Sequence, residues 1–326
     1  MQDTVVCNSQ KVSAWRITTS LAAILCVMIP ISAVADGLPP LPNEASAFGD
    51  MGSCIVGRLA LWPDIAPEEK SRERGHYVFD EKTQAWRMRN VAFPEVVLFK
   101  PREVRSNTLV LGVPGGGYNS QNLKTFCCNI RPILESGRWV ALLHHRLPRR
   151  KGRPIYAAPR EDGARAVRIL RAQAAQYGYA PERIGAVGFS AGGNLVTLLA
   201  TASQDEVYAR VDAADDLSAH LNFAIPVYPA YVLDDGAAGT NVNRGMDAKL
   251  LPHFKFDAKT PPMFMIHGDD DPFSSMASVK LYEELRRRQI PAQLFVYARA
   301  GHGLGEGCNV AGWQSRIVDW LDRMGF

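Results

Sequence analysis

Short apolar segments alternate with amphipathic segments from residue 91 to the end of the chain. The apolar segments, most of them β-branched or aromatic, predict strands over 91–99, 108–113, 139–144, 184–189, 223–228, 263–267 and 293–297. Helical periodicity predicts helices over 162–176, 191–202, 274–289 and 313–324. Continuously apolar strands separated by helices are typical of a mostly parallel sheet covered on both faces. We therefore expect a doubly wound α/β architecture.

Two regions lack this alternation. After a proline-rich lead-in at 38–42, residues up to Pro67 show no periodic pattern and predict loops. Residues 230–259 are rich in aspartate and glycine and predict an excursion above the sheet, either a small cap over a site or a surface loop. Because 47% of the residues are hydrophobic, one large core is feasible, and we expect a single domain over 36–326.

The N-terminal segment has the features of an export signal. Lys11 and Arg16 precede an uncharged run over 21–35, and small residues at 33–35 suit a signal peptidase. The run is short and is broken by Pro30, so we expect no membrane span after cleavage. Residues 1–35 are thus predicted to be a signal peptide that is cleaved before Asp36, and the protein to be exported to the periplasm or the extracellular space.

Four cysteines remain after that cleavage and would meet an oxidising compartment. They are Cys54, Cys127, Cys128 and Cys308. A bond between the adjacent Cys127 and Cys128 would be strained, so either one of them pairs with Cys308 or Cys54, or the thiols are free and buried. Their spacing does not match a metal site, and no metal or organic cofactor is expected.

The charge pattern argues against a nucleic-acid partner. The formal net charge is only +4 over 326 residues. The basic cluster at 146–153 has no accompanying aromatic residues or nucleic-acid motif, and it predicts a solvated loop.

Ser190 lies at the junction of a predicted strand and a predicted helix, with a glycine two residues away on each side. The segment from Gly188 to Gly192 fits the pattern G-x-S-x-G, in which a sharp turn exposes the serine oxygen at the edge of a sheet. A serine hydroxyl needs a base to become a nucleophile at neutral pH. The required strand and helix on either side of the pattern make Ser190 the candidate nucleophile.

His302 and Asp271 are the candidate partners of this serine. His302 follows the last predicted strand on a glycine-flanked loop, whereas the other histidines lie before the motif or in polar connections. Asp271 belongs to the loop after the strand at 263–267 and gives the chain order serine, acid, histidine. Asp270 is the alternative acid, while Asp269 and Asp270 are otherwise expected to cap the next helix or face solvent.

A glycine triplet supplies candidate donors for an oxyanion. Residues 114–118 follow a predicted strand, and the N–H groups of Gly116 and Gly117, with that of Ala191, are the expected oxyanion donors. A phosphate-binding loop would require a Lys-Ser/Thr pair directly after its last glycine, and Tyr118 follows Gly117 instead.

These elements resemble the α/β-hydrolase superfamily, and in detail the secreted bacterial acetylxylan-esterase-like carbohydrate esterases, which are related to hormone-sensitive-lipase-type esterases. The resemblance is carried by five stretches: LALWPDIAP, VPGGGY, EDGARAVRILRAQAAQYGYAPERIGAVGFSAGGNL, HGDDDPF, and YARAGHGLG followed by WQSRIVDWL. It implies an α/β-hydrolase fold with Ser190, Asp271 and His302 as catalytic residues. This sequence departs from the pattern of these relatives at Pro114, where lipase-type relatives have a histidine, and at His144 and His145, where a lysine-tyrosine pair is expected. These differences are expected to affect the part of the pocket that binds the leaving group.

The resemblance implies an exported serine esterase that removes short acyl groups, acetyl first, from a carbohydrate or similar polar alcohol. Tyr118, Tyr228, Tyr231 and Trp313 offer aromatic faces for a sugar ring. Two alternatives remain. One is a peptidase of the prolyl-oligopeptidase type, which would normally carry a propeller domain for which the chain has no room. The other is a hydrolase-like scaffold that binds its ligand without turnover.

Overall fold

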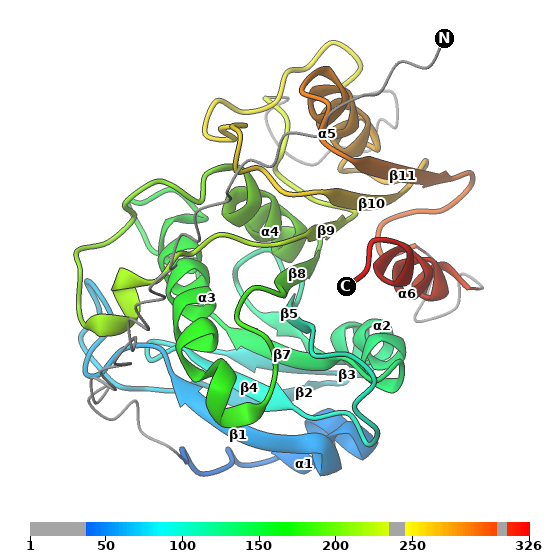
Figure 1. Cartoon of the computed structure of the whole chain (residues 1–326). Coiled ribbons are helices and arrows are strands. Elements are labelled where there is room, and N and C mark those ends of the chain that lie inside the picture. The colour runs from blue at the N-terminus through cyan, green and yellow to red at the C-terminus, as the bar shows by residue number, and fades with distance from the viewer. Residues whose placement is uncertain (1–36, 235–244, 305–311) are drawn as a thin grey trace, which may run out of the picture. The chain divides into compact units, whose positions relative to one another are not determined.

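An eight-stranded sheet forms the centre of the computed structural model, which describes residues 37–234, 245–304 and 312–326. Its spatial order is β1 (Ile55–Ala60), β4 (Glu95–Phe99), β7 (Trp139–His144), β5 (Leu109–Val113), β8 (Ile184–Phe189), β9 (Ala224–Val227), β10 (Met263–Gly268) and β11 (Ala292–Tyr297) (Figure 1). The pairs β1–β4 and β4–β7 are antiparallel, and all later neighbours are parallel. The expected mostly parallel, doubly wound fold is confirmed.

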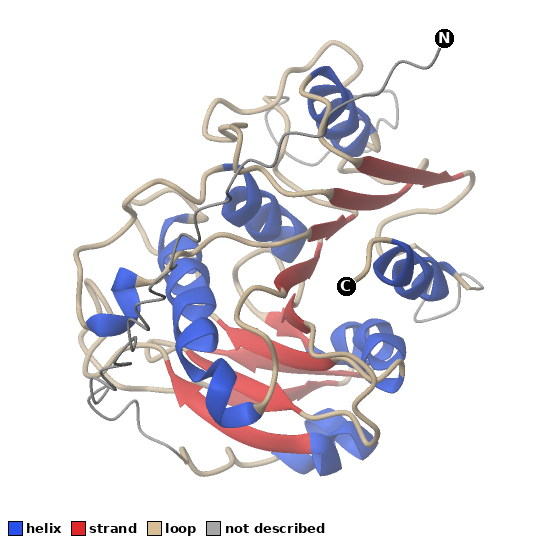
Figure 2. Cartoon of the chain, viewed as in Figure 1, coloured by secondary structure: helices blue, strands red, loops and turns tan. Residues whose placement is uncertain are grey.

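Helices cover both faces of this sheet (Figure 2). One face carries α3 (Ala157–Tyr177), α4 (Ala191–Thr201) and α5 (Met276–Arg287), and the other carries α1 (Glu44–Phe48), α2 (Leu123–Glu135) and α6 (Trp313–Arg323). Two 3-10 helices, η1 (Gly49–Cys54) and η2 (Ala213–Asp216), complete the helices of the described residues. This two-sided cover explains why the central strands are apolar at every position rather than at alternate positions.

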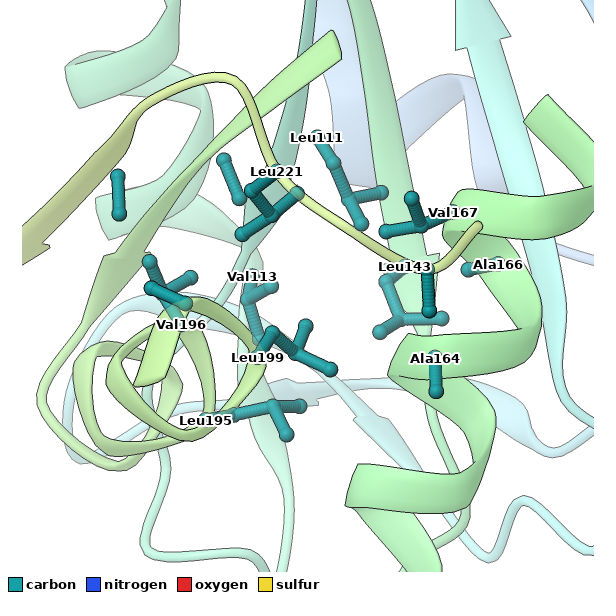
Figure 3. Close-up of a cluster of buried hydrophobic side chains, with 14 of the residues drawn as sticks. Leu111, Val113, Leu143, Ala164, Ala166, Val167, Leu195, Val196, Leu199 and Leu221 are labelled. Carbon is teal, nitrogen blue, oxygen red and sulfur yellow. The ribbon is translucent and has the colours of Figure 1, made fainter. Parts of the chain in front are cut away.

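The side chains of β5 show how the core is divided. Leu111 and Val113 belong to the cluster under α3 and α4, whereas Val110, the residue before Leu111, belongs to the cluster on the opposite face. Figure 3 shows Leu111 and Val113 in the same cluster as Val167 of α3 and Leu199 of α4. Leu111 is fully buried, so Leu111→Ala would cost about 2–5 kcal/mol of folding stability.

A second sheet of three short strands lies beside α2. It consists of β2 (His76–Asp80), β3 (Ala85–Arg89) and β6 (Gln121–Asn122), in that order. Its link to the main sheet is a buried chain of hydrogen bonds, in which His144 Nε2 lies 2.9 Å from Tyr77 Oη and His144 Nδ1 lies 2.6 Å from Gln121 Oε1. Burial lowers the pKa of His144 to about 3, so this imidazole is neutral at physiological pH.

The prediction of loops up to Pro67 is wrong, because α1, η1 and β1 lie there. In β1 the buried residues are confined to its end, and an edge strand of this kind has no continuous apolar run to reveal it. The small sheet and α2 were not expected either. Helix α2 contains Pro132 in its last turns, and its start is capped by the Asn122 side chain, which accepts a hydrogen bond from Thr125 N.

Two other predictions concern residues that lie partly or wholly outside the described ranges. The predicted signal peptide at 1–35 lies wholly outside them, and the predicted cap or loop at 230–259 lies partly outside them. Within 230–259, the described parts 230–234 and 245–259 form turns, with one bridge between Leu233 and Leu250. Among the residues that are described, no helix is long and apolar enough to cross a lipid bilayer.

The cysteines divide into two states. Cys128 is disulfide-bonded, while Cys54 and Cys127 are free, so a pairing through Cys54 is excluded. Burial raises the pKa of Cys127 to about 12, which keeps its thiol protonated. Cys308 lies outside the described residues.

The basic cluster at 146–153 is not a uniformly solvated loop, contrary to expectation. Arg146 is almost fully buried, where it forms ion pairs with Glu161 and Asp162 and donates to the carbonyl oxygen of Pro67. Buried guanidinium groups need such complete pairing, because an unpaired charge in the interior is very costly. Arg146 therefore joins α3 to the segment before β2 rather than facing a polyanion.

Candidate active site

Ser190 forms the corner between β8 and α4 in a conformation that L-residues seldom adopt. Its φ is 56° and its ψ is −117°. The chain turns so tightly that a Cβ atom on Gly188 would lie 2.1 Å from the carbonyl oxygen of Gly192, and one on Gly192 would lie 2.1 Å from that of Val113. Only glycine fits at these two positions. The backbone strain at Ser190 is of the kind that is found at functional sites.

His302 lies against Ser190, from the loop that follows β11. Its Nε2 atom lies 2.8 Å from Ser190 Oγ, and its Nδ1 atom lies 2.8 Å from Asp271 Oδ2. The imidazole also packs against the rings of Phe273 and Tyr228, with centroid distances of 4.8 and 5.1 Å. The structure therefore brings together the three residues that the sequence singled out.

Asp271 is fully buried in the loop that follows β10, and its carboxylate is held from several directions. Oδ1 accepts a 2.8 Å hydrogen bond from Phe273 N, and His267 Nε2 lies 3.3 Å from Oδ2. Burial alone would raise the pKa of Asp271, but the imidazoles of His267 and His302 hold it well below its usual range. Asp269 and Asp270 are exposed to solvent, so neither takes the place of Asp271.

His267 is a member of this cluster that the sequence did not reveal. It is the last but one residue of β10, and its Nδ1 atom lies 2.8 Å from Ser278 Oγ. Burial lowers the pKa of His267, so the ring remains neutral beside the carboxylate. The only signal in the sequence is its position four residues before Asp271, at the end of an apolar strand.

Residues 114–118, which we call the glycine loop, direct two backbone N–H groups away from the turn that they form. The carbonyl oxygen of Gly115 accepts from Asn122 N at 2.9 Å, and that of Gly116 accepts from Asn119 N and Ser120 N at 3.1 and 3.3 Å. In a trans peptide the C=O and N–H groups point in opposite directions. The N–H groups of Gly116 and Gly117 therefore point away from these contacts, and neither donates to any backbone carbonyl among the described residues.

The N–H of Ala191 is also available, because it is the first residue of α4 and has no partner within the helix. Gly116 has a φ of 139°, and a Cβ atom there would lie 2.0 Å from Ser120 O. Glycine is thus required at the position that directs one of the expected donors.

Side chains join the glycine loop to two neighbouring elements. Tyr118 Oη donates to Asn194 Oδ1 at 2.7 Å, and Asn194 Nδ2 donates to the carbonyl oxygen of Tyr231 at 2.9 Å. Arg149 Nε donates to the carbonyl oxygen of Gly117 at 2.7 Å, and its Nη2 donates to Tyr231 Oη at 2.8 Å. The loop, α4 and the segment after β9 are therefore connected by one closed set of hydrogen bonds.

Ser190 and His302 open into a cavity of about 400 Å³. Its lining includes an aromatic group, Phe189, Tyr228, Tyr231 and Phe273, and a polar group from other elements, Arg87, Asn122 and Thr125. Tyr118 and Trp313, which were considered as sugar-binding faces, are buried in the core and do not line it. The volume suits a small ligand.

Nothing in the described part of the chain gathers three or more histidine, cysteine or acidic side chains in an arrangement that could hold a metal ion. The geometry consists of a hydroxyl, an imidazole, an ionised carboxylate and unused backbone donors. Such an arrangement is suited to acyl transfer through a covalent intermediate.

The curated relatives of this chain include an acetylxylan esterase and a xylanase. It is 26% identical over 234 residues to an acetylxylan esterase of Xylanibacter ruminicola, covering 65% of this chain and 44% of that protein. It is also 26% identical over 210 residues to endo-1,4-beta-xylanase B of Butyrivibrio fibrisolvens, covering 60% of this chain and 32% of that protein. The chain thus spans less than half the length of either relative.

Solved structures share the fold. The acetyl ester-xyloside bifunctional hydrolase of Caldicellulosiruptor lactoaceticus aligns with a TM-score of 0.60 at 24% identity, covering 81% of this chain and 97% of that one. Esterase 2 of Thermogutta terrifontis, in a structure phosphorylated by paraoxon, aligns with a TM-score of 0.59 at 22% identity, covering 78% of this chain and 96% of that one.

A family model gives the most direct assignment. The BD-FAE model matches residues 97–285, which include the glycine loop, Ser190 and Asp271. Because this match covers more than half of the chain, we conclude that the protein belongs to the BD-FAE family.

Proposed function

We propose that this protein is an exported serine carboxylic-ester hydrolase that removes short acyl groups, acetyl first among them, from a carbohydrate or similar polar alcohol. The observation that carries the proposal is the continuous contact from Asp271 through His302 to Ser190, with 2.8 Å at each step. The strained backbone at Ser190 adds independent support.

In the first half of the reaction, Ser190 Oγ attacks the ester carbonyl carbon and His302 Nε2 takes its proton. The tetrahedral intermediate carries a negative charge on the former carbonyl oxygen, which the N–H groups of Gly116, Gly117 and Ala191 stabilise. The intermediate collapses when the C–O bond to the alcohol breaks and His302 returns the proton to the departing oxygen.

In the second half, water replaces the alcohol. His302 takes a proton from the water, whose oxygen attacks the acyl carbon, and the bond to Ser190 Oγ breaks as the proton passes to the serine. Asp271 holds the imidazole in the tautomer that carries hydrogen on Nδ1 and stabilises the imidazolium form. The depressed pKa of Asp271 suits this role, because the carboxylate remains ionised throughout.

The relatives support the choice of acyl group and alcohol. One is named an acetylxylan esterase and a solved neighbour is named an acetyl ester-xyloside hydrolase. The signal-like residues at 1–35 support export.

The direct test compares the native protein with Ser190→Ala. We expect the native protein to hydrolyse p-nitrophenyl acetate and to be labelled covalently by a fluorophosphonate, and the variant to do neither above background. An Asp270→Asn variant is the matched control, because Asp270 lies in the same loop as Asp271 but faces solvent. Equal hydrolysis by the native protein and Ser190→Ala would refute the proposal.

A further inference from the structure

The polar group in the lining of the catalytic cavity comes from the small sheet and the start of α2. Arg87 of β3 lies opposite Asn122 of β6 in the strand register, and Thr125 lies in the first turn of α2. All three line the same cavity as Ser190 and His302. We call these three residues the polar wall.

The polar wall has hydrogen-bond donors that no described residue uses. Arg87 donates through Nε to Asp80 Oδ2 at 2.9 Å and through Nη2 to Thr83 Oγ1 at 3.3 Å, but its Nη1 has no partner in the described parts of the chain. Asn122 uses its Oδ1 to accept from Thr125 N, which leaves its Nδ2 free. The hydroxyl of Thr125 also has no hydrogen bond within those parts.

The polar wall is held in place by buried contacts. Gln121, the neighbour of Asn122, donates through Nε2 to the carbonyl oxygen of Leu143 at 2.8 Å and contacts His144 through Oε1. Gln121 is fully buried. A rigid support of this kind fixes the positions of the free donors before a ligand arrives, which reduces the entropy that binding must cost.

We propose that Arg87 is a specificity-determining residue, which binds hydroxyl oxygens of the sugar part of the ester together with Asn122 and Thr125. This inference rests on the proposed esterase function and adds to it the residues that select the alcohol. Arg87 is paired with Asp80, so the polar wall carries little net charge and suits a neutral sugar better than a carboxylate. An ester whose alcohol lacks hydroxyl groups leaves the free donors unpaired.

The experiment compares two esters and two arginine variants. The esters are an acetylated xylo-oligosaccharide and p-nitrophenyl acetate, whose leaving group has no hydroxyl to offer the polar wall. The variants are Arg87→Met and its control Arg89→Met, since Arg89 lies two residues further along β3, is exposed, and does not line the cavity. Both changes remove one positive charge from the same strand.

We expect Arg87→Met to lower kcat/KM for the acetylated xylo-oligosaccharide by about 10- to 100-fold, because a site built to bind substrate hydroxyls discriminates through them. For p-nitrophenyl acetate the change should stay within about 2-fold, and Arg89→Met should leave both esters unaffected. Thr125→Val, which preserves the backbone cap of α2, should show the same selective loss on a smaller scale.

Other outcomes would overturn the inference. Equal losses of kcat/KM for both esters in Arg87→Met would assign Arg87 a purely structural role. If Arg87→Met does not fold, equal losses for both esters in Thr125→Val would overturn the inference instead. A preference for a carboxylate-bearing acetyl ester over the neutral sugar, lost in Arg87→Met, would replace the sugar with an anion. If the native protein hydrolyses p-nitrophenyl acetate but no acetylated sugar, this inference and the choice of a carbohydrate fail, while the serine-esterase mechanism stands. If it hydrolyses neither ester, the proposed function fails as well.

Discussion

Arg149 is hydrogen-bonded to Gly117, with its Nε atom 2.7 Å from the glycine carbonyl oxygen. Gly117 supplies one of the proposed oxyanion donors, so an exposed side chain outside the triad holds the loop on which transition-state stabilisation depends. The second bond of Arg149, to Tyr231 Oη, ties this contact to the aromatic group of the cavity lining.

Arg149→Met is therefore expected to lower kcat for p-nitrophenyl acetate by roughly 3- to 30-fold with little change in KM, because small displacements of catalytic groups have large effects on rate. Steady-state kinetics measures this split. Arg149→Lys keeps the charge without the two-pronged contact and should recover only part of the rate. Lys151→Met, in the same exposed loop, is the control. A loss that appears in KM alone would contradict the role of Arg149 in positioning the loop.

Asp271 and Asp270 should respond very differently to replacement by asparagine. Asp271→Asn removes the charge beside His302 Nδ1 and favours the wrong tautomer, so we expect kcat to fall by about 10³- to 10⁴-fold. Asp270→Asn should change kcat by less than about 2-fold, because this side chain is exposed. Comparable losses in the two variants would show that the loop as a whole, rather than one carboxylate, supports the imidazole.

The backbone strain at Ser190 predicts a gain in stability when the side chain is removed entirely. With φ at 56°, Ser190→Gly relieves the strain that Ser190→Ala retains. Both variants should be inactive, but the glycine variant should have a free energy of unfolding higher by about 1–2 kcal/mol. Urea denaturation followed by circular dichroism provides the comparison. Equal stabilities would mean that the corner is relaxed in solution.

Buried histidines should make the fold sensitive to mild acid. Burial lowers the pKa of His144 to about 3 and that of His145 to about 4, below the value near 6.5 that an unfolded histidine has. Between about pH 4 and pH 6 the unfolded chain therefore binds more protons at these sites than the folded chain. Stability is fully present above the unfolded pKa and is lost as the pH falls, at about 1.4 kcal/mol per pH unit for each histidine.

A His144→Gln variant tests this linkage through its slope rather than its absolute stability. Urea unfolding measured from about pH 4 to pH 6 should give a pH dependence that is shallower by about 1.4 kcal/mol per pH unit than that of the native protein. Identical slopes would mean that His144 keeps an ordinary pKa in the fold.

The sequence predicted those parts of the fold that local patterns encode. The strands at 139–144 and 184–189 were placed to the residue, because two covered faces require apolar residues at every position. Strand β1 and the small sheet escaped prediction, since their half-exposed residues carry no such run. Ser190 and His302 were recognisable because glycine-flanked turns mark them.

The rest of the site depends on contacts between segments that are distant in sequence. His267 resembled any strand-end histidine until its Nε2 was found 3.3 Å from Asp271. Arg87 lies on a hairpin with no motif, and only the register with Asn122 brings it to the cavity. Arg146 was wrongly predicted to be solvated for the same reason. The basic run at 146–153 does not indicate that Arg146 is buried against the carboxylates of Glu161 and Asp162, which lie on a different element.

The hairpin formed by β2 and β3 lies between β1 and β4 in the sequence, and it belongs to a separate sheet from the strands that precede Ser190, Asp271 and His302. Its tip, residues 80–85, does not line the cavity, but it contains Asp80 and Thr83, which hold Arg87 in place. Exchange of this tip between related enzymes is thus a route to new sugar preferences, in which selection of the alcohol evolves separately from cleavage of the ester.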